Sequence, residues 1–95
     1  MEIRDDQVFT VSKDVLFQEV SGETVLLDLA SEQYFGLDEV GTRVWQLLNE
    51  GEGFAAMVDA LLEEYEVERE RLEADVRDLL GSLLEAGLIE QKEPV

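Results

Sequence analysis

Hydrophobic residues follow two different spacings along this chain, and the change falls near residue 38. Before that point, β-branched and aromatic residues mix with polar ones and are interrupted by turn residues, which is typical of strands. After it, Leu, Val and Ala recur at the three- and four-residue steps of amphipathic helices, among many Glu residues. The sequence therefore predicts strands first and helices second.

Three strands are expected in the first part of the chain, at 15–20, 23–29 and 33–37. Ser21-Gly22 separates the first two, and glycine tolerates the positive φ that a two-residue hairpin turn requires. A second turn at 30–32 leads into the third strand, so consecutive strands should pair antiparallel. The segment 33–37 would then lie at an edge of the sheet, and 8–12 could add a short extended segment before it.

Three helices are expected after the strands, over 38–49, 54–65 and from about residue 70 to 86. Asp38 is suited to cap the first of them, and we expect Trp45 to pack in the core. The helical spacing of this segment predicts one buried stripe made of Val40, Val44, Leu47 and Leu48. Gly87 stands where a left-handed residue would end the last helix, before Leu88 and Ile89 return to the core. The last residues, 91–95, are expected to fray.

This order of elements predicts a single α+β domain over residues 1–95, with its core at about 15–90. A three-stranded antiparallel sheet followed by three helices, the last two joined by a tight corner, has the composition of a winged helix-turn-helix. Periodicity supports the elements themselves more strongly than it supports their arrangement.

The charge of the chain excludes some classes of partner. The chain carries 24 Asp and Glu against 7 Lys and Arg, a formal net charge of −17. Phosphate backbones and anionic membrane surfaces would be repelled, so neither nucleic acid nor membrane is an expected partner. Acidic residues also gather at 63–73, around the corner between the last two helices, where a DNA-binding winged helix would carry Lys and Arg.

The amino-acid composition gives little support to a catalytic role. The sequence contains no Cys and no His, which removes thiolate and imidazole metal ligands and every Cys–His or Ser–His nucleophile. No calcium-loop or phosphate-loop motif is present, so we expect no metal, no cofactor and no enzymatic activity. The absence of a signal peptide and of a long apolar run favours the cytoplasm.

Two groups of short motifs carry a resemblance to a known family. In the first half they are Val25 to Leu29, Tyr34 to Gly41 and Val44 to Leu48; in the second half they are Tyr65-Glu66-Val67, Asp75-Val76, Leu79-Leu80, Leu83-Leu84 and Glu85 to Ile89. Together, in this order and spacing, the chain resembles the PqqD-like family, the precursor recognition elements of ribosomally made, modified peptides. The resemblance covers about residues 15 to 90.

That resemblance implies a small winged-helix domain that binds the leader segment of a precursor peptide and delivers it to a modifying enzyme or leader peptidase. Such domains carry no catalytic residues. Discrete versions occur in lasso-peptide clusters and in the pyrroloquinoline quinone pathway, and we expect the lasso-peptide setting for this chain. The charge of −17 exceeds what the family pattern requires and suggests a basic leader.

The resemblance also implies a binding site, since the family's leader lies as an added strand against the third strand and packs toward the third helix. The matching segments are 33–37 and 72–83. The strand carries no Lys and no Pro, and Gly36 would let a partner backbone approach closely. The predicted peptide-binding residues are Gln33, Tyr34, Phe35, Gly36, Leu72, Asp75, Val76 and Leu79.

Simpler explanations remain open for each part of this site. The strand could merely be short, with Gly36 turning the chain into the first helix. Leu79 and Leu80 lie on opposite flanks of the last helix's apolar face, so either both pack inside or one lines a cleft. Two rival functions also remain, an acidic accessory subunit that binds a basic protein and a winged-helix transcription regulator.

Overall fold

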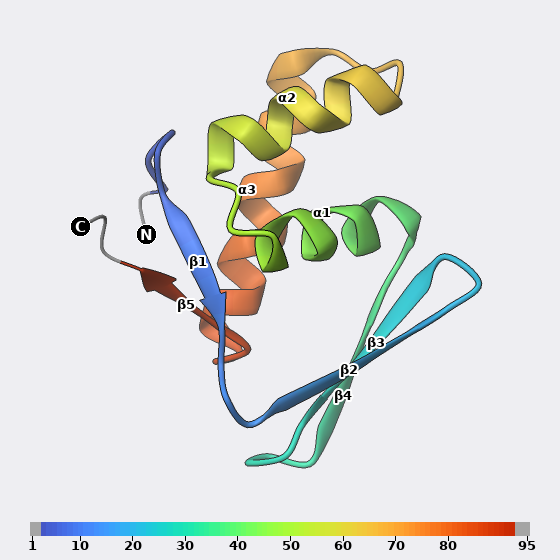
Figure 1. Cartoon of the computed structure of the whole chain (residues 1–95), viewed down its shortest axis with the longest axis vertical. Coiled ribbons are helices and arrows are strands. Elements are labelled where there is room, and N and C mark those ends of the chain that lie inside the picture. The colour runs from blue at the N-terminus through green and yellow to red at the C-terminus, as the bar shows by residue number, and fades with distance from the viewer. Residues whose placement is uncertain (1–2, 93–95) are drawn as a thin grey trace.

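The computed structural model describes residues 3–92, which form three helices and five strands (Figure 1). In chain order, the elements are β1 Val8–Val11, β2 Val15–Val20, β3 Glu23–Asp28, β4 Gln33–Leu37, α1 Glu39–Asn49, α2 Phe54–Glu64, α3 Arg69–Glu85 and β5 Ile89–Lys92. The predicted strands and helices are all present, within a residue or so at their ends. The fold is therefore α+β, with antiparallel strands and three helices.

The larger sheet has the order β2-β3-β4, and both pairs of strands are antiparallel. Ser21 and Gly22 connect β2 to β3 with φ values of 52° and 83°. Positive φ at both central residues is the geometry of the tight hairpin turn whose twist matches that of the strands. The predicted hairpin and the position of β4 at one edge of the sheet are confirmed.

A second sheet lies apart from the first, and the sequence did not predict it. β1 pairs antiparallel with β5, with Val8 opposite Lys92 and Val11 opposite Ile89 (Figure 1). A single three-stranded sheet was therefore wrong, as was a frayed end at Gln91 and Lys92. Main-chain pairing with β1 orders these residues, although their own sequence is short and polar. The rest of the segment expected to fray, 93–95, lies outside the described residues.

The helix ends follow the predicted capping. The Asp38 carboxylate accepts a hydrogen bond from the Gly41 N–H at 2.8 Å, which fixes the first turn of α1 directly after β4. At the other end of the helical part, Gly87 has a φ of 75°. The Gly87 and Leu88 N–H groups donate to the carbonyls of Leu84 and Leu83, the pattern of a Schellman cap. That cap turns the chain back into β5.

The core lies between the inner face of the larger sheet and the three helices. Leu26 from β3, Trp45 from α1 and Leu80 from α3 are fully buried within it, so the prediction that Trp45 packs in the core is confirmed. The Phe17 ring lies edge-on to Trp45, with ring centroids 5.4 Å apart. The ring contact joins β2 to α1, and β3 also packs against α1. Among residues 3–92, no helix is long and apolar enough to cross a membrane.

Candidate functional site: a groove at the edge of β4

A groove of about 510 Å³ opens where β4 ends and α1 begins, and α3 forms its opposite side. Three segments that are distant in the sequence meet here because the Asp38 cap turns the chain sharply from β4 into α1. The lining residues are Gly36, Leu37, Asp38, Val40, Gly41, Val44, Asp75, Val76 and Leu79.

The groove has an apolar base and a partly open rim. Val44 and Val76 are buried and form the base. Leu79 is half-buried and packs against the core, while Val40 is 36% exposed. An apolar side chain entering the groove would therefore leave water and contact aliphatic carbon on several sides.

The charges that line the groove are negative. Asp38 uses one carboxylate oxygen to cap α1. The Asp75 side chain is 65% exposed, and its nearest ion-pair contact, with Arg71, is 3.8 Å long. Such a loose surface pair contributes little to folding, which leaves the Asp75 carboxylate free to meet a cation or an N–H donor.

A smaller cavity of about 120 Å³ adjoins the groove and shares Val40 and Asp75 with it. Its lining includes Leu72, which is buried, and Tyr65 at the end of α2. Burial raises the pKa of the Tyr65 phenol, and the nearby carboxylates of Glu39 and Glu64 raise it further. This side of the groove is thus largely apolar, and its lining carries one cation, Arg71, and one carboxylate, Asp75.

The free edge of β4 borders the groove. Within the described part of the chain, β4 pairs with β3 alone, so the main-chain groups on its other side have no strand partner. A Cβ built on Gly36 would meet no atom within 4 Å. The fold itself does not require glycine there, since the space over Gly36 on that face of the sheet is open. An edge of this kind can pair with an extended peptide.

The structure brings together four of the eight predicted site residues, Gly36, Asp75, Val76 and Leu79. Leu72 lines the adjoining cavity instead. The other three lie on β4, where alternate side chains point to opposite faces. Phe35 packs half-buried against the core, Tyr34 is exposed on the outer face, and the exposed Gln33 begins the strand.

Sequence reasoning missed the contribution of the α1 end of the groove. Leu37, Asp38, Val40, Gly41 and Val44 all line it. The hydrophobic spacing assigned Val40 and Val44 to one buried stripe, yet only Val44 is buried. The cap at Asp38 was a usable signal, because a helix that begins directly after an edge strand must place its first turn beside that edge.

No metal centre accompanies the groove: across residues 3–92, no group of three or more Asp or Glu side chains could hold a metal ion. The arrangement can bind a chain by main-chain pairing and side-chain contact. It contains carboxylates and apolar groups, and its lining has no paired nucleophile and base.

Comparisons with known proteins agree with this geometry. TbiB1, solved in complex with the TbiA(beta) leader peptide, is 42% identical, and the match covers 88% of this chain and 98% of that one with a TM-score of 0.82. A lasso peptide synthetase B1, complexed with the leader peptide, is 32% identical, with coverages of 86% and 96% and a TM-score of 0.80. Curated protein sequences gave no significant match.

The family comparison covers β3 and β4 of the larger sheet, all three helices and the first residue of β5. The family model described as coenzyme PQQ synthesis protein D (PqqD) matches residues 23–89. This range includes β4, α1 and α3, the three elements that form the groove. The chain therefore belongs to the PqqD family.

Proposed function

We propose that this protein binds the leader segment of a ribosomally made precursor peptide, without catalysis, and delivers it to a modifying enzyme or leader peptidase in lasso-peptide biosynthesis. The observation that carries the proposal is the apolar groove beside the unpaired edge of β4. Two relatives of known structure, 42% and 32% identical, were solved with leader peptides bound.

Binding would combine two kinds of contact. The leader would add to β4 as an antiparallel strand, and its main-chain hydrogen bonds would give affinity with little dependence on sequence. Alternate side chains would enter the groove against Val76 and Leu79, which would select among peptides. A basic residue of the leader could pair with Asp75. The predicted site residues Gln33 to Gly36 would supply the strand edge.

Two finer predictions belong to this proposal. A non-enzymatic role is supported by the lining of the groove, whose only ionisable side chains are two carboxylates, Asp38 and Asp75, with no hydroxyl, thiol or amine beside them. A winged helix-turn-helix would use α2 and α3, joined at 65–68, as its helical pair. This corner carries Glu66 and Glu68, which favours a protein ligand over DNA.

The test is a titration of the protein with the TbiA(beta) leader peptide, followed by backbone chemical shifts. We expect the largest shifts at Tyr34 to Gly36 and at Asp75 to Leu79. Shifts confined to α2, or no binding of this peptide or of a leader encoded beside the gene, would overturn the proposal. Intact-mass measurement of the mixture should show an unchanged peptide, and a cleaved or modified product from pure protein would contradict the non-catalytic role.

A further inference from the structure

A second cavity lies beyond the other end of β4, next to the turn that joins β3 to β4. Its volume is about 660 Å³, and its lining comes from segment 10–14, from Asp28 and Ala30, from Ala86 and Gly87, and from Glu90. We call it the turn cavity. Sites for small ligands measure about 300–1,000 Å³, so it has room for several side chains of a peptide. It shares no lining residue with the groove, and leader binding in the groove alone leaves it unexplained.

Hydrogen bonds hold the walls of the turn cavity together. The Ser12 hydroxyl donates to the Gly87 carbonyl at 2.7 Å, and the Ser12 N–H donates to the Leu88 carbonyl at 3.0 Å. The Leu29 N–H donates to the Asp14 carbonyl at 2.9 Å, which ties the β3–β4 turn to the same loop. The cavity is therefore formed by the fold itself, and an occupant would not have to order its walls on binding.

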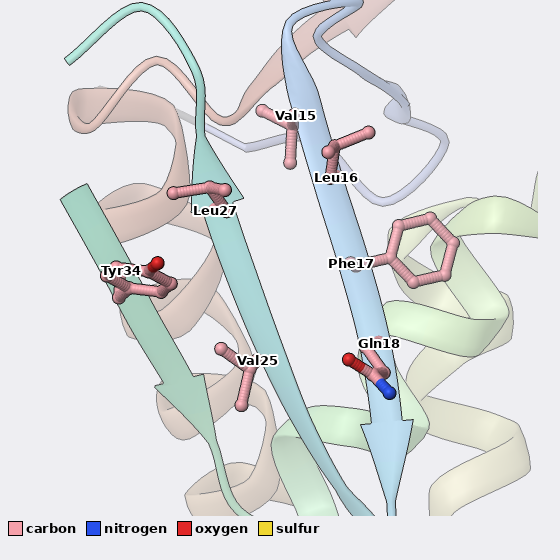
Figure 2. Close-up of a pocket in the computed structure, with 7 residues that line it drawn as sticks. All are labelled: Val15, Leu16, Phe17, Gln18, Val25, Leu27 and Tyr34. Atoms are coloured by element: carbon pink, nitrogen blue, oxygen red, sulfur yellow. The ribbon is translucent and has the colours of Figure 1, made fainter. Parts of the chain in front are cut away.

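The groove and the turn cavity lie at opposite ends of β4 and α3. β4 runs from Gln33, beside the turn, to Leu37 in the groove, whereas α3 runs from Leu79 in the groove to Ala86 in the turn cavity. Figure 2 looks onto the outer side of the sheet: β3 and β4, which carry Leu27 and Tyr34, run in opposite directions, and α3 lies behind β4.

The two elements cover similar distances between the groove and the turn cavity. The five residues of β4 span about 13 Å, and α3 rises about 10 Å from Leu79 to Ala86. Leu79, Leu83 and Ala86 lie on one face of α3, because steps of four and three residues separate them. Leu83 is buried, and the other two are half-buried. A continuous apolar stripe of α3 therefore leads from the groove to the turn cavity.

Strand polarity decides which part of a bound precursor would reach the turn cavity. A leader added antiparallel to β4 would enter beside Leu37 and leave beside Gln33. At about 3.3 Å per residue, roughly four residues cover the length of β4. The residues that follow would then meet the turn cavity, and they belong to the side of the leader that faces the modified part of the precursor.

The lining of the turn cavity is mainly acidic. Asp28 is engaged in hydrogen bonds within the β3–β4 turn. Asp14 and Glu90 are exposed, and among residues 3–92 neither forms an ion pair. Lys13 is the one cation of the lining, in a chain whose net charge is −17. A basic side chain entering here would be attracted, and an acidic one repelled.

We propose that the turn cavity binds the residues of the precursor that directly follow the leader strand, with a preference for a basic side chain among them. Because this second site is defined by the path of a bound leader, it rests on the proposed function. It would lengthen the part of the precursor that the protein reads, and it would hold the chain in one direction as it leaves β4.

The first experiment uses the full chain and two peptides. One is the TbiA(beta) leader peptide, and the other is the same peptide ended at its last residue protected from amide exchange in the complex. The test variant is Ala30→Trp, which places a large side chain in the mouth of the cavity. Ala74→Trp is the matched control, since Ala74 is also exposed and lines neither the groove nor the turn cavity.

We expect the longer peptide to bind the unmodified protein at least about threefold more tightly than the shortened one. Ala30→Trp should remove this difference and leave the affinity of the shortened peptide unchanged, whereas Ala74→Trp should preserve the difference. Equal affinities of the two peptides for the unmodified protein, or an equal loss for both in Ala30→Trp, would overturn the proposal.

A second experiment tests the preference for charge. Lys, Ala or Glu is placed at the second residue after the protected strand of the longer peptide. We expect the Lys peptide to bind about threefold or more tightly than the Glu peptide, and Asp14→Asn/Glu90→Gln to remove the preference. Glu63→Gln/Glu85→Gln changes the net charge equally at exposed positions outside the cavity and should retain it.

The remaining outcomes separate this site from the proposed function. Tighter binding of the Glu peptide, or a preference that both double variants reduce equally, would overturn the role of Asp14 and Glu90. Failure of the unmodified protein to bind either length of leader would overturn the proposed function together with this site. Leader binding with shifts in the groove but none at Ala30 and Gly87 would overturn this site alone.

Discussion

Thr24 on β3 donates a hydrogen bond from its hydroxyl to Oγ1 of Thr42 on α1, with 2.9 Å between the two oxygens, and both residues are buried. Thr42 in turn donates to the carbonyl of Leu37, the last residue of β4, at 3.5 Å. A short polar chain thus links the middle strand to the helix that closes the groove. Because these two hydrogen bonds join β3, α1 and the end of β4, they contribute both to the stability of the fold and to the shape of the groove.

Thr42→Val should lower the free energy of unfolding by about 1–3 kcal/mol, because it leaves the buried Thr24 hydroxyl without its acceptor. Thr24→Val/Thr42→Val should cost less than the two single changes added together, since it removes both partners. Urea unfolding of the unmodified protein, the two single variants and the double variant measures the coupling energy between the two residues. Strictly additive losses would show that the bond contributes nothing.

Leu79→Asp should weaken binding of the TbiA(beta) leader peptide by about ten- to a hundredfold, because a carboxylate would face an apolar ligand side chain in the groove. Leu84→Asp is the matched control: Leu84 lies on the same helix, is also half-buried against the core, and does not line the groove. Equal losses of affinity in both variants would attribute the effect to folding. Glu63→Ala, on the exposed side of α2, should change neither the leader affinity nor the stability of the fold.

Binding of a basic leader should weaken as salt rises, since opposite charges are screened over about 8 Å at physiological ionic strength. Asp75→Asn should reduce the slope of affinity against salt, because Asp75 is an exposed carboxylate in the groove. Isothermal titration at several salt concentrations measures both. A flat response in the unmodified protein would mean that apolar contacts dominate and that the charge of the groove does not select the peptide.

Tyr65 should make stability depend on alkaline pH. Its pKa is raised in the folded protein, chiefly by burial, so its neutral form is favoured there. The unfolded state loses this proton first, near pH 10, and the contribution of Tyr65 to stability, intact below that pH, is lost as pH rises through the folded-state pKa. Urea unfolding should therefore show a steeper alkaline decline for the unmodified protein than for Tyr65→Phe. Parallel curves would contradict the shift.

Gly87→Ala should destabilise the protein by about 1 kcal/mol or more, because its φ of 75° is costly for a residue with a Cβ. Gly81→Ala is the opposite case. Gly81 lies inside α3, where an added Cβ would meet no atom within 4 Å, so alanine should stabilise the helix by about 0.5–1 kcal/mol. Thermal unfolding distinguishes the two variants. A change of melting temperature in the same direction for both would contradict the role of Gly87 as a cap.

Local sequence signals accounted for most of the elements. The Ser21-Gly22 turn, the Asp38 cap and the Gly87 cap each depend on one or two residues and their immediate neighbours, which a sequence displays directly. The helix periodicity likewise placed Leu72, Val76 and Leu83 at the centre of the apolar face of α3, and all three are buried. These features depend on chemistry within a few residues.

Features set by distant pairing were harder to predict. The partner of β1 is β5, and nothing in the short polar segment 89–92 indicates it. The groove shows the same difference: Leu79 on α3 was identified from the width of one helix face, whereas Val40 was assigned to a buried stripe and lines the open rim. Its exposure depends on how α1 meets α3, which single-helix periodicity does not specify.

Pairing of β1 with β5 has a consequence for how the protein is made. Val8 lies opposite Lys92, so the partner of β1 is synthesised after all three helices. While the chain is still being translated, β1 stays without its ladder, and only the larger sheet and the helices can form in advance. The smaller sheet should therefore form only after β5 has left the ribosome, and a ribosome stalled shortly before Ile89 should hold a chain in which β1 is open to proteolysis.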